Sequence, residues 1–378
     1  MILGAEHRLL FESVRQVAQR ELAPHAAHWD RTQHFPREAL HALGKLGLGG
    51  VAIADTWGGA GMDSTALALA IEAIAYGDGA TSTIIAVTNL AAGIVQGFGH
   101  DAQRETFLRP LASGEQFGAF CLTEPQTGSD ASAITTRAEK NAQGYVLNGV
   151  KQFITSGKNA DIAIVFAVTD KFAGKKGISA FIVPTHTPGY QVARLEEKTG
   201  QRASDTAQII FENCQIPAHA LLGSEGQGYR IALANLESGR INIAAQAVGM
   251  AQAALDAALT YARERRTFGQ AIIDHQAVNF RLADAATQIE AARQLYLHAA
   301  ALRDAGQPCL KEASMAKLFA SEMAEQVCSD AMQIHGGYGY VNDFVVERIW
   351  RDVRVCKIYE GASDIQRMLI GRAIATQA

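Results

Sequence analysis

The hydrophobic period of this chain changes twice, and those changes limit what it can fold into. Residues 6–109 carry apolar side chains at helical spacing, whereas short β-rich runs begin at Phe117-Gly118 and continue to about residue 211. From Gly228 to the end the pattern is helical again, with stripes for about four antiparallel helices. This order predicts three units, an N-terminal helical domain at 1–116, a central β domain at 117–226 and a C-terminal helical bundle at 227–378.

The central unit is predicted to be a small β-barrel or sandwich. Its apolar runs are short and are separated by Gly, Asn, Asp and Pro at spacings typical of all-β units. Asn148-Gly149, between two of these runs, predicts a hairpin turn. The expected fold class is therefore mainly α with one β domain, and the C-terminal unit is expected to be a four-helix bundle.

Composition and charge exclude several classes of function. With 378 residues the chain is too long for one ordinary core, and its 19% charged and 48% apolar residues are typical of a globular protein. Its net charge of −4, with scattered Lys and Arg, argues against nucleic acid as a partner. Apolar runs are interrupted before a span of about 20 residues and no signal pattern opens the chain, so we expect a cytoplasmic protein without membrane attachment.

Cysteine and histidine give no support for a disulfide framework or a metal site. The five cysteines are odd in number and far apart, without CxxC spacing. The histidines lack carboxylates at metal-ligand spacing. We therefore expect buried thiols and no metal. The one local basic cluster, Arg263 with Arg265 and Arg266, suits a single anionic ligand.

A single carboxylate stands out near the end of the chain, in Tyr359-Glu360-Gly361. The small residues Ala362 and Ser363 follow it and would open a helix. Two interpretations are open on these residues alone. In one, the acidic side chain and Ser363 serve as a helix cap. In the other, Glu360 points inward as a functional group.

A polar loop at residues 121–130 follows the first predicted strand. Gly128 permits close approach of a backbone, while Thr123 and Ser129 offer hydrogen-bonding groups to the edge of a flat polar ring. The segment is also compatible with an ordinary turn between two strands.

A second segment of interest spans residues 148–157. Phe153 could lie against an aromatic cofactor, and Thr155 could donate a hydrogen bond to it. Taken alone, this segment is compatible with another hairpin.

Further motifs lie in the helical bundle, and together with the two loops and the Glu360 segment they carry a resemblance. They are Glu237-Ser238-Gly239-Arg240, Arg265-Arg266-Thr267-Phe268-Gly269 with Gln276, and Gln333-Ile334-His335-Gly336-Gly337-Tyr338-Gly339-Tyr340. In this order, over essentially the whole chain, these segments resemble the acyl-CoA dehydrogenase family. Its members are flavoproteins that oxidise the α,β bond of acyl-CoA thioesters, so the resemblance implies FAD as cofactor and an acyl-CoA as substrate.

The resemblance implies roles for the residues at matching positions. In the β domain, the implied FAD contacts are Phe120, Leu122, Thr123, Gly128, Ser129, Phe153, Ile154 and Thr155. The implied contacts to the FAD of a neighbouring subunit are Arg265, Thr267, Phe268 and Gln276, with Gln333, Gly336 and Gly337 on the adenosine side. After the base, the implied FAD contacts are Ala362, Ser363 and Asp364. Sharing of the cofactor implies an obligate oligomer, in the family usually a homotetramer built as a dimer of dimers.

The chain departs from the family pattern at several positions. Phe153 stands where the family usually has Trp, and Thr127 stands where it typically has a small residue. Ala362 stands where it commonly has Thr. The stacking role survives the first change, and the last removes one hydroxyl contact to FAD.

Glu360 matches the family's catalytic base, which removes the α-proton while flavin N5 accepts the β-hydride. In some relatives the base lies on a bundle helix at the position of Gly239, where this chain has no side chain. The implied substrate-side residues are Ser129, Glu237, Arg240 and Gly361. Arg240 has a second interpretation, an ion pair with a neighbouring acid inside the bundle.

The substrate is expected to be a short or branched short-chain acyl-CoA, as in isobutyryl-CoA dehydrogenases. No Lys or Arg occurs between Lys45 and Arg104, so helices there can enclose an apolar acyl group but have no cation for a second carboxylate. The resemblance implies electron-transferring flavoprotein as redox partner, in fatty acid β-oxidation or branched-chain amino acid degradation. The alternatives are an acyl-CoA oxidase or nitroalkane-type flavin oxidase on the same scaffold, and a non-catalytic flavoprotein kept as an assembly subunit.

Overall fold

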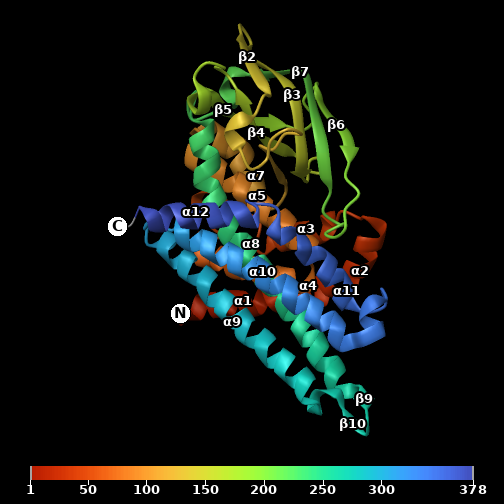
Figure 1. The fold of residues 1–378 in the computed structure, drawn as a ribbon. Coiled ribbons are helices and arrows are strands. Elements are labelled where there is room, and N and C mark those ends of the chain that lie inside the picture. Colours follow the sequence, from red (N-terminus) through yellow and green to blue (C-terminus); the bar gives the residue numbers. More distant parts are fainter. Residues whose placement is uncertain (1, 377–378) are drawn as a thin grey trace.

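The computed structural model describes residues 2–376 and begins and ends with helices around a β domain (Figure 1). The N-terminal helices are α1 (Ala5–Val17), α2 (Ala23–Thr32), α3 (Arg37–Lys45), α4 (Ser64–Gly77), α5 (Gly79–Phe98), α6 (Asp101–Gln103) and α7 (Arg109–Ala112). The main strands are β1 (Gly118–Cys121), β2 (Arg137–Asn141), β3 (Gly144–Thr155), β4 (Ile162–Val168), β5 (Ile178–Pro184), β6 (Tyr190–Leu195), β7 (Thr206–Pro217) and β8 (Leu221–Leu222). The C-terminal helices are α8 (Gly228–Glu264), α9 (Gln276–Asp304), α10 (Leu310–His335), α11 (Val345–Val353) and α12 (Ser363–Ala375), and the short strands β9 (Arg266–Thr267) and β10 (Gln270–Ala271) join α8 to α9.

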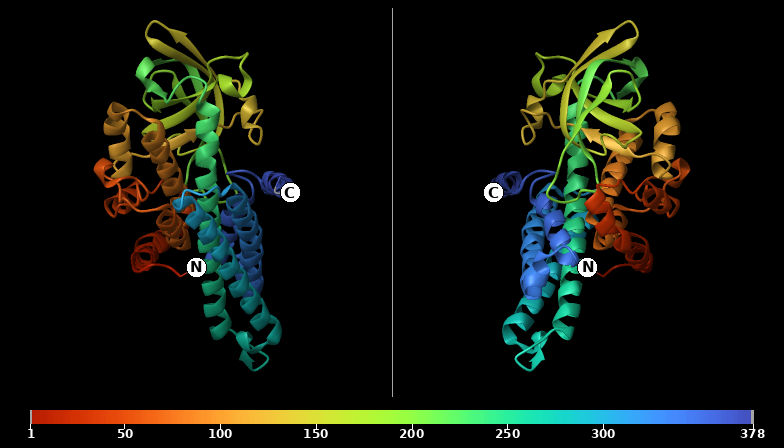
Figure 2. Two further views of the ribbon diagram at one scale, coloured as in Figure 1. Left: turned by 90° about the vertical axis from the view of Figure 1, so that its left-hand side faces the viewer. Right: turned by 90° about the vertical axis from the view of Figure 1, so that its right-hand side faces the viewer.

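The long helix α8 holds the units together. Figure 2 shows α8 between the N-terminal helices on one side and α9 and α10 on the other. Gly249 makes the contact with α4 close, because a Cβ there would lie 2.2 Å from the carbonyl oxygen of Glu72. The fold class predicted from the sequence is confirmed: a β domain lies between two helical units. The exact boundaries at 116/117 and 226/227 stay predictions.

Helices α4 and α5 are nearly uncharged and deeply buried, and each begins at an aspartate cap. Asp63 Oδ1 accepts the backbone N–H of Ala66 at 2.8 Å, and Asp78 Oδ2 accepts that of Thr81 at 2.8 Å. By length and composition α5 is apolar enough to cross a membrane, contrary to the expectation that every apolar run is too short, but 72% of its apolar window is buried inside the protein. It serves here as a core helix.

The β domain contains one eight-stranded sheet in the order β6-β7-β3-β2-β4-β5-β8, with β1 paired in parallel to β4. The hairpin turn predicted at Asn148-Gly149 is wrong, because β3 runs through both residues. The register with β7 shifts between Leu147 and Gly149, so a bulge replaces the turn. Gly149 has a φ of 152°, and a Cβ there would lie 2.5 Å from Thr136 Oγ1. The glycine therefore allows β3 to approach the segment at Thr136 closely.

Candidate active site

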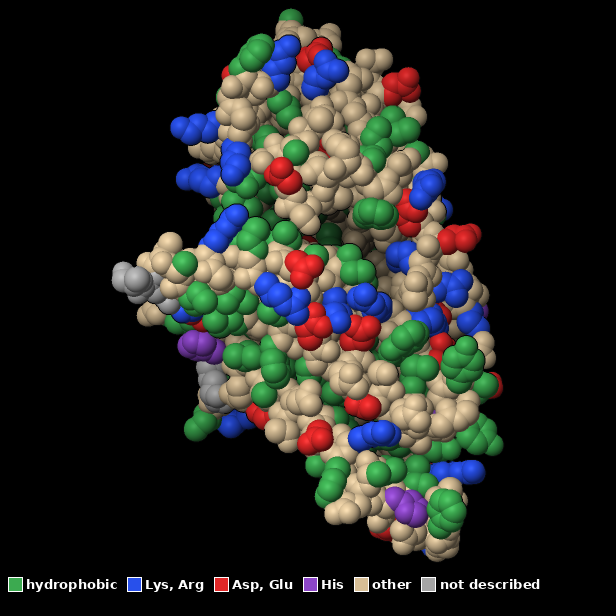
Figure 3. Space-filling view, in the orientation of Figure 1, with side chains coloured by type: hydrophobic (Ala, Val, Ile, Leu, Met, Phe, Trp, Pro, Cys, Tyr) green, Lys and Arg blue, Asp and Glu red, His purple; other side chains and the backbone are tan. Residues whose placement is uncertain are grey.

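The Glu360 loop joins α11 to α12 at the junction of the bundle with the β domain (Figure 1). The face drawn in Figure 3 is hollowed between these two parts of the molecule. Glu360 has a φ of 51° and Gly361 a φ of 90°, so two successive residues occupy the left-handed region. Such a conformation is uncommon for a residue with a side chain and is typical of sites where the surroundings impose it.

Side chains from two helices hold this backbone. Gln366 Nε2, on α12, donates to the carbonyl of Glu360 at 3.2 Å and to that of Gly361 at 2.8 Å. Lys317 Nζ, on α10, donates to the carbonyl of Gly361 at 2.7 Å. The loop therefore has its carbonyls fixed from both sides, which offsets the cost of its conformation.

The Glu360 carboxylate points inward onto α8. A Cβ on Gly239 would lie 2.5 Å from Glu360 Oε2, so any other residue at that position would displace the carboxylate. Oε2 is buried and has no hydrogen-bond partner among residues 2–376. Helix α12 begins after Ala362 without a side-chain cap. The helix-cap interpretation of Glu360 is therefore wrong.

Burial raises the pKa of Glu360 above its ordinary value, and the charges of Arg240 and Lys317 oppose that rise. Arg240 is 6% exposed, and its Nε atom is buried without a partner in the described part of the chain. No ion pair of Arg240 is found among residues 2–376, so the alternative of an intrabundle pair is not supported. Glu237 instead pairs with Arg303, at 3.3 Å. An unpaired carboxylate and a buried guanidinium thus share one small region.

Tyr359 anchors the loop to a buried polar cluster that sequence reasoning missed. Its hydroxyl donates to Gln246 Oε1 on α8 and accepts from Gln201 Nε2 at 3.2 Å. Gln246 Nε2 in turn donates to Ser82 Oγ at 2.7 Å and to Thr83 Oγ1 at 2.6 Å. The residue before the base is therefore tied to the N-terminal helices, to the β domain and to the bundle.

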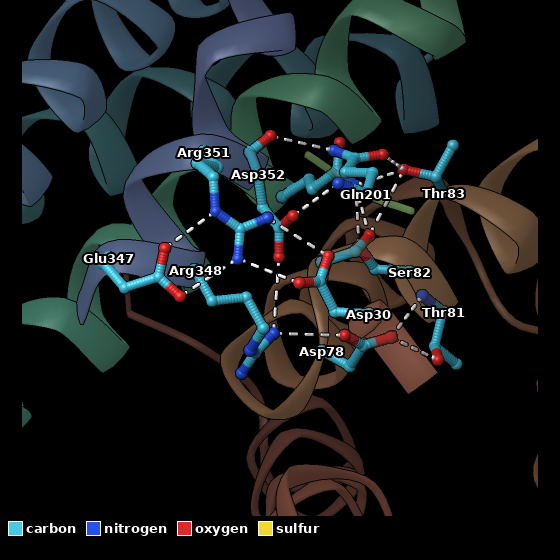
Figure 4. Close-up of polar contacts among 12 residues, drawn as sticks. Asp30, Asp78, Thr81, Ser82, Thr83, Gln201, Glu347, Arg348, Arg351 and Asp352 are labelled. Carbon is cyan, nitrogen blue, oxygen red and sulfur yellow. Dashed lines mark hydrogen bonds and ion pairs between the residues drawn. The ribbon is translucent and has the colours of Figure 1, made fainter. Parts of the chain in front are cut away.

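The same cluster extends through α11 (Figure 4). The backbone N–H of Gln201 donates to Asp352, and Arg348 lies 3.3 Å from carboxylate oxygens of both Asp352 and Asp78. These residues are far apart in the sequence, and only the folded chain brings them together. The cluster fixes α11, and thus the start of the Glu360 loop, against the other two units.

The loop at residues 121–130 lies beside the segment 148–157, most of which belongs to β3. The backbone N–H of Gln152 donates to the carbonyl of Thr123 at 2.9 Å, and Lys151 Nζ donates to that of Leu122 at 3.1 Å. Lys151 also pairs with Glu124 at 2.8 Å, and both side chains are almost fully buried. This buried pair, which the sequence did not single out, holds the loop carrying Thr123 and Ser129 in place.

The predicted flavin residues of the β domain differ in accessibility. Phe153 is 63% exposed and has a φ of 57°, so its ring stands out from the strand and is free to contact a ligand. Ser129 is exposed, whereas Leu122 is buried. Ile154 is 1% exposed and packs in the sheet core, which leaves only its backbone for a cofactor. Roles for these residues stay predictions.

Glu124 gives a stability prediction. Burial would raise its pKa, but the charge and hydrogen bond of Lys151, with bonds from Thr136 and Thr135, lower that pKa from 4.5 to about 2. Because the folded-state pKa is depressed, the stabilisation is complete above pH 4.5 and is lost as the pH falls through about 2. Glu124→Gln should lower the free energy of unfolding at pH 7 by about 3–5 kcal/mol, since it leaves Lys151 unpaired.

Chemical denaturation at pH 7 and at pH 3 measures this effect. The gap between wild type and Glu124→Gln should narrow at pH 3, while Glu139→Gln, at an exposed pair with Arg137, should stay within about 0.5 kcal/mol of wild type. A Glu124→Gln protein as stable as wild type at pH 7 would contradict the assigned role of the pair.

A second candidate site lies at the far end of the bundle, next to β9 and β10. A cavity of about 700 Å³ is lined there by Tyr261, Arg265, Thr267, Ile272, Ile334, His335, Gly336, Gly337, Tyr338, Val341, Asp343 and Phe344. A Cβ added to Gly336 or Gly337 would meet nothing within 4 Å, so their backbone is open to a ligand. The cavity has room and donors for a phosphate-bearing group.

Four of the predicted neighbour-subunit contacts line this cavity, namely Arg265, Thr267, Gly336 and Gly337. Phe268 is 96% exposed, and Gln276 and Gln333 are also exposed but are not lining residues. Sequence reasoning missed the aromatic wall, in which Tyr261 stacks on His335 with ring centroids 4.3 Å apart.

The two candidate sites lie apart: the Glu360 loop is at the junction of the bundle with the β domain, and the cavity is at the far end of the bundle. In Figure 1 the β domain is at one end and β9 and β10 are at the other, with the length of the bundle between them.

Comparisons with known proteins agree with this geometry. The chain matches models of the acyl-CoA dehydrogenase N-terminal domain over residues 4–115, the middle domain over 119–214 and the C-terminal domain over 226–375. It is 46% identical to an acyl-CoA dehydrogenase of Bacillus subtilis over 98% of both chains. It is 45% identical to the human mitochondrial short-chain specific acyl-CoA dehydrogenase over 97% of this chain and 90% of that protein.

Solved structures show the same likeness over the whole chain. Butyryl-CoA dehydrogenase from Megasphaera elsdenii matches with a TM-score of 0.97 at 40% identity, covering 99% of both chains. A chain from a structure of the electron transferring flavoprotein of Acidaminococcus fermentans matches with a TM-score of 0.97 at 41% identity, also covering 99% of both. A glutaryl-CoA dehydrogenase from Mycobacterium smegmatis, in complex with FADH2, matches with a TM-score of 0.94 at 28% identity over 99% of this chain and 95% of that one.

Proposed function

The chain belongs to the acyl-CoA dehydrogenase family, and from this premise we propose that it oxidises a short-chain acyl-CoA to the 2-enoyl-CoA with Glu360 as the base. It is an acyl-CoA dehydrogenase, an oxidoreductase. The observation that carries the proposal is the buried Glu360 carboxylate, which faces Gly239 with one oxygen unpartnered. A carboxylate held in this way is free to take a proton from a substrate that fills the remaining space.

Burial fits Glu360 for proton removal. A carboxylate in water is too weak a base for an α-proton, and desolvation raises its pKa towards the pH of catalysis. The charges of Arg240 and Lys317 oppose this rise and favour the ionised form that accepts the proton. In this proposal the backbone N–H of Glu360 polarises the thioester carbonyl. Each such donor is worth about 3–4 kcal/mol in comparable sites.

FAD fits the residues at both candidate sites. The family is FAD-dependent, and a bound FAD supplies the acceptor for the β-hydride. Exposed Phe153 and the adjoining loop at 121–130 would hold the flavin ring, and Arg265 with Gly336 and Gly337 would hold the phosphate and adenosine part. Because these groups lie apart in Figure 1, in the β domain and at the far end of the bundle, we infer that the cofactor bridges two subunits. The homotetramer, a dimer of dimers, is what the family resemblance implies.

A short apolar acyl group is the proposed substrate. Residues 46–103, which include the buried helices α4 and α5, contain no Lys or Arg, so these helices offer no cation to a second carboxylate on the acyl tail. The likeness to short-chain specific and butyryl-CoA dehydrogenases favours a C4 chain. Electron-transferring flavoprotein is the proposed electron acceptor. The likeness of this protein to a chain in a structure of the electron transferring flavoprotein of Acidaminococcus fermentans supports this proposal.

A panel of acyl-CoAs mixed anaerobically with the FAD-loaded protein tests the substrate. Butyryl-CoA should bleach the flavin at least about tenfold faster than octanoyl-CoA, since a pocket discriminates each unaccommodated methylene by about 1–3 kcal/mol. Isobutyryl-CoA tests branching, and glutaryl-CoA should leave the flavin oxidised. Equal rates with octanoyl-CoA would refute the short-chain assignment, and bleaching by glutaryl-CoA would refute the apolar tail.

The same preparation separates the alternatives. A flavin oxidase would consume oxygen in step with substrate when no other acceptor is present. An assembly subunit would bind FAD and leave it oxidised with every acyl-CoA of the panel.

A further inference from the structure

Lys317 is a buried lysine that the proposed chemistry has not used. It lies on α10, it is fully buried, and its Nζ donates to the carbonyl of Gly361 at 2.7 Å. No carboxylate forms an ion pair with it among residues 2–376. The hydrogen-bond acceptor found for this ammonium in the described part of the chain is a backbone oxygen of the catalytic loop.

Packing does not explain a lysine at this position. Burying an ammonium without a carboxylate is costly, and a Leu or Met would fill a similar volume without that cost. Burial lowers the pKa of Lys317 from 10.5 to about 8, which records this cost. Because burying this ammonium is costly, we expect Lys317 to make a specific functional contact.

Lys317 contacts the backbone that sets the conformation of Glu360. Its acceptor, Gly361, directly follows Glu360, and both residues have positive φ. Without the ammonium, Gln366 alone would hold the carbonyl of Gly361. The Glu360 carboxylate has no hydrogen bond of its own at Oε2, so the backbone of the loop decides where that oxygen stands.

The charge of Lys317 also acts on Glu360. The groups that face Glu360 are Arg240 from α8 and Lys317 from α10, and both favour its ionised form. The charged and titratable groups that face Lys317 are Cys356 before the loop, Glu360, Arg240 and Glu322 on its own helix. One lysine is thus placed to fix the loop and to favour the ionised base.

We propose that Lys317 is a positioning residue for the reaction, whose ammonium holds the Gly361 carbonyl and so fixes the Glu360 carboxylate against Gly239. The inference rests on the proposed function, because it assumes that Glu360 is the base. It goes beyond that function by assigning a role to a side chain that contacts the loop carrying the base.

Lys317→Met tests the proposal, in the FAD-loaded protein with butyryl-CoA as substrate. We expect kcat to fall by on the order of 10–100-fold with little change in KM, because a misplaced base impairs the chemical step more than binding. The acid limb of the pH–kcat profile should move to higher pH, since loss of a positive charge raises the pKa of Glu360. Lys317→Arg keeps the charge, so its acid limb should stay near that of wild type.

Arg104→Met is the control. Arg104 Nε also donates to a backbone carbonyl, that of Gln96, at 3.1 Å. Its replacement removes the same kind of bond away from the Glu360 loop and its anchors, so thermal stability should fall while kcat and the pH profile stay at wild-type values. If Lys317→Met does not accumulate as FAD-loaded protein, Lys317→Gln provides the same comparison, because it keeps a donor and loses the charge.

A Lys317→Met or Lys317→Gln protein with wild-type kcat and an unmoved acid limb would overturn the proposal. The two levels of inference fail in different ways. If wild type does not oxidise the panel, or if Glu360→Gln turns over normally, the proposed function is wrong. If Glu360→Gln is inactive and the neutral Lys317 variants behave as wild type, only the role of Lys317 is wrong.

Discussion

Glu360→Gln is expected to abolish acyl-CoA oxidation while leaving FAD bound. The variant keeps the size of the side chain and loses the proton acceptor, and general base catalysis is worth roughly 10²–10⁴-fold in rate. FAD content should not change, because glutamine keeps the size of the side chain and the loop backbone is held by Gln366 and Lys317. Steady-state turnover with butyryl-CoA and an artificial electron acceptor, together with the flavin absorbance per chain, measures both quantities.

Glu212→Gln is the matched control for this experiment. Glu212 lies exposed on β7 in the β domain. Its substitution makes the same chemical change, a carboxylate to an amide, away from the Glu360 loop. It should keep wild-type turnover. Wild-type turnover in Glu360→Gln itself would remove Glu360 from the mechanism, and loss of FAD from that variant would place the residue in cofactor binding instead.

Mixing two inactive variants should restore activity, which is the second large effect expected. Arg265→Glu reverses a charge in the far cavity and should leave the purified protein without FAD. Glu360→Gln keeps that cavity intact but lacks the base. If each active site combines the Glu360 loop of one subunit with the Arg265 cavity of its neighbour, one of the two sites in each mixed dimer carries neither defect.

Co-expression of the two variants in equal amounts measures this complementation. Random pairing predicts that about a quarter of all sites are intact, because half of the dimers are mixed and each contains one intact site. Co-expression of Glu360→Gln with wild type gives the reference for subunit exchange. Mixed oligomers that are formed but remain inactive would contradict a shared cofactor.

Local motifs singled out the Glu360 loop and four of the residues that line the far cavity, because glycines in both places point to an unusual backbone. Gly361 after Glu360, and Gly336 next to Gly337, indicate conformations or approaches that other residues disfavour. The same kind of reasoning failed at Asn148-Gly149, where the residue pair predicted a hairpin turn but the structure has a β-bulge. What decided that position was the close approach of Thr136, which lies on another segment.

The supporting residues were beyond the reach of sequence patterns. Lys317 reads as one polar position in an amphipathic helix, and nothing around it in the sequence marks the carbonyl that it contacts. Gln246 and Gln201 meet Tyr359 across separations of more than a hundred residues. Side chains of this kind act through tertiary contacts, and only the folded chain reveals them.

Anaerobic titration of the FAD-loaded protein with butyryl-CoA tests the central claim most directly. For wild type, about one equivalent of substrate per flavin should bleach the absorbance, with formation of 2-butenoyl-CoA, because each flavin accepts one hydride. Glu360→Gln, titrated alongside, should bind the substrate and stay oxidised. A wild-type flavin that stays oxidised at full FAD occupancy, or a Glu360→Gln flavin that bleaches at the wild-type rate, would contradict the account.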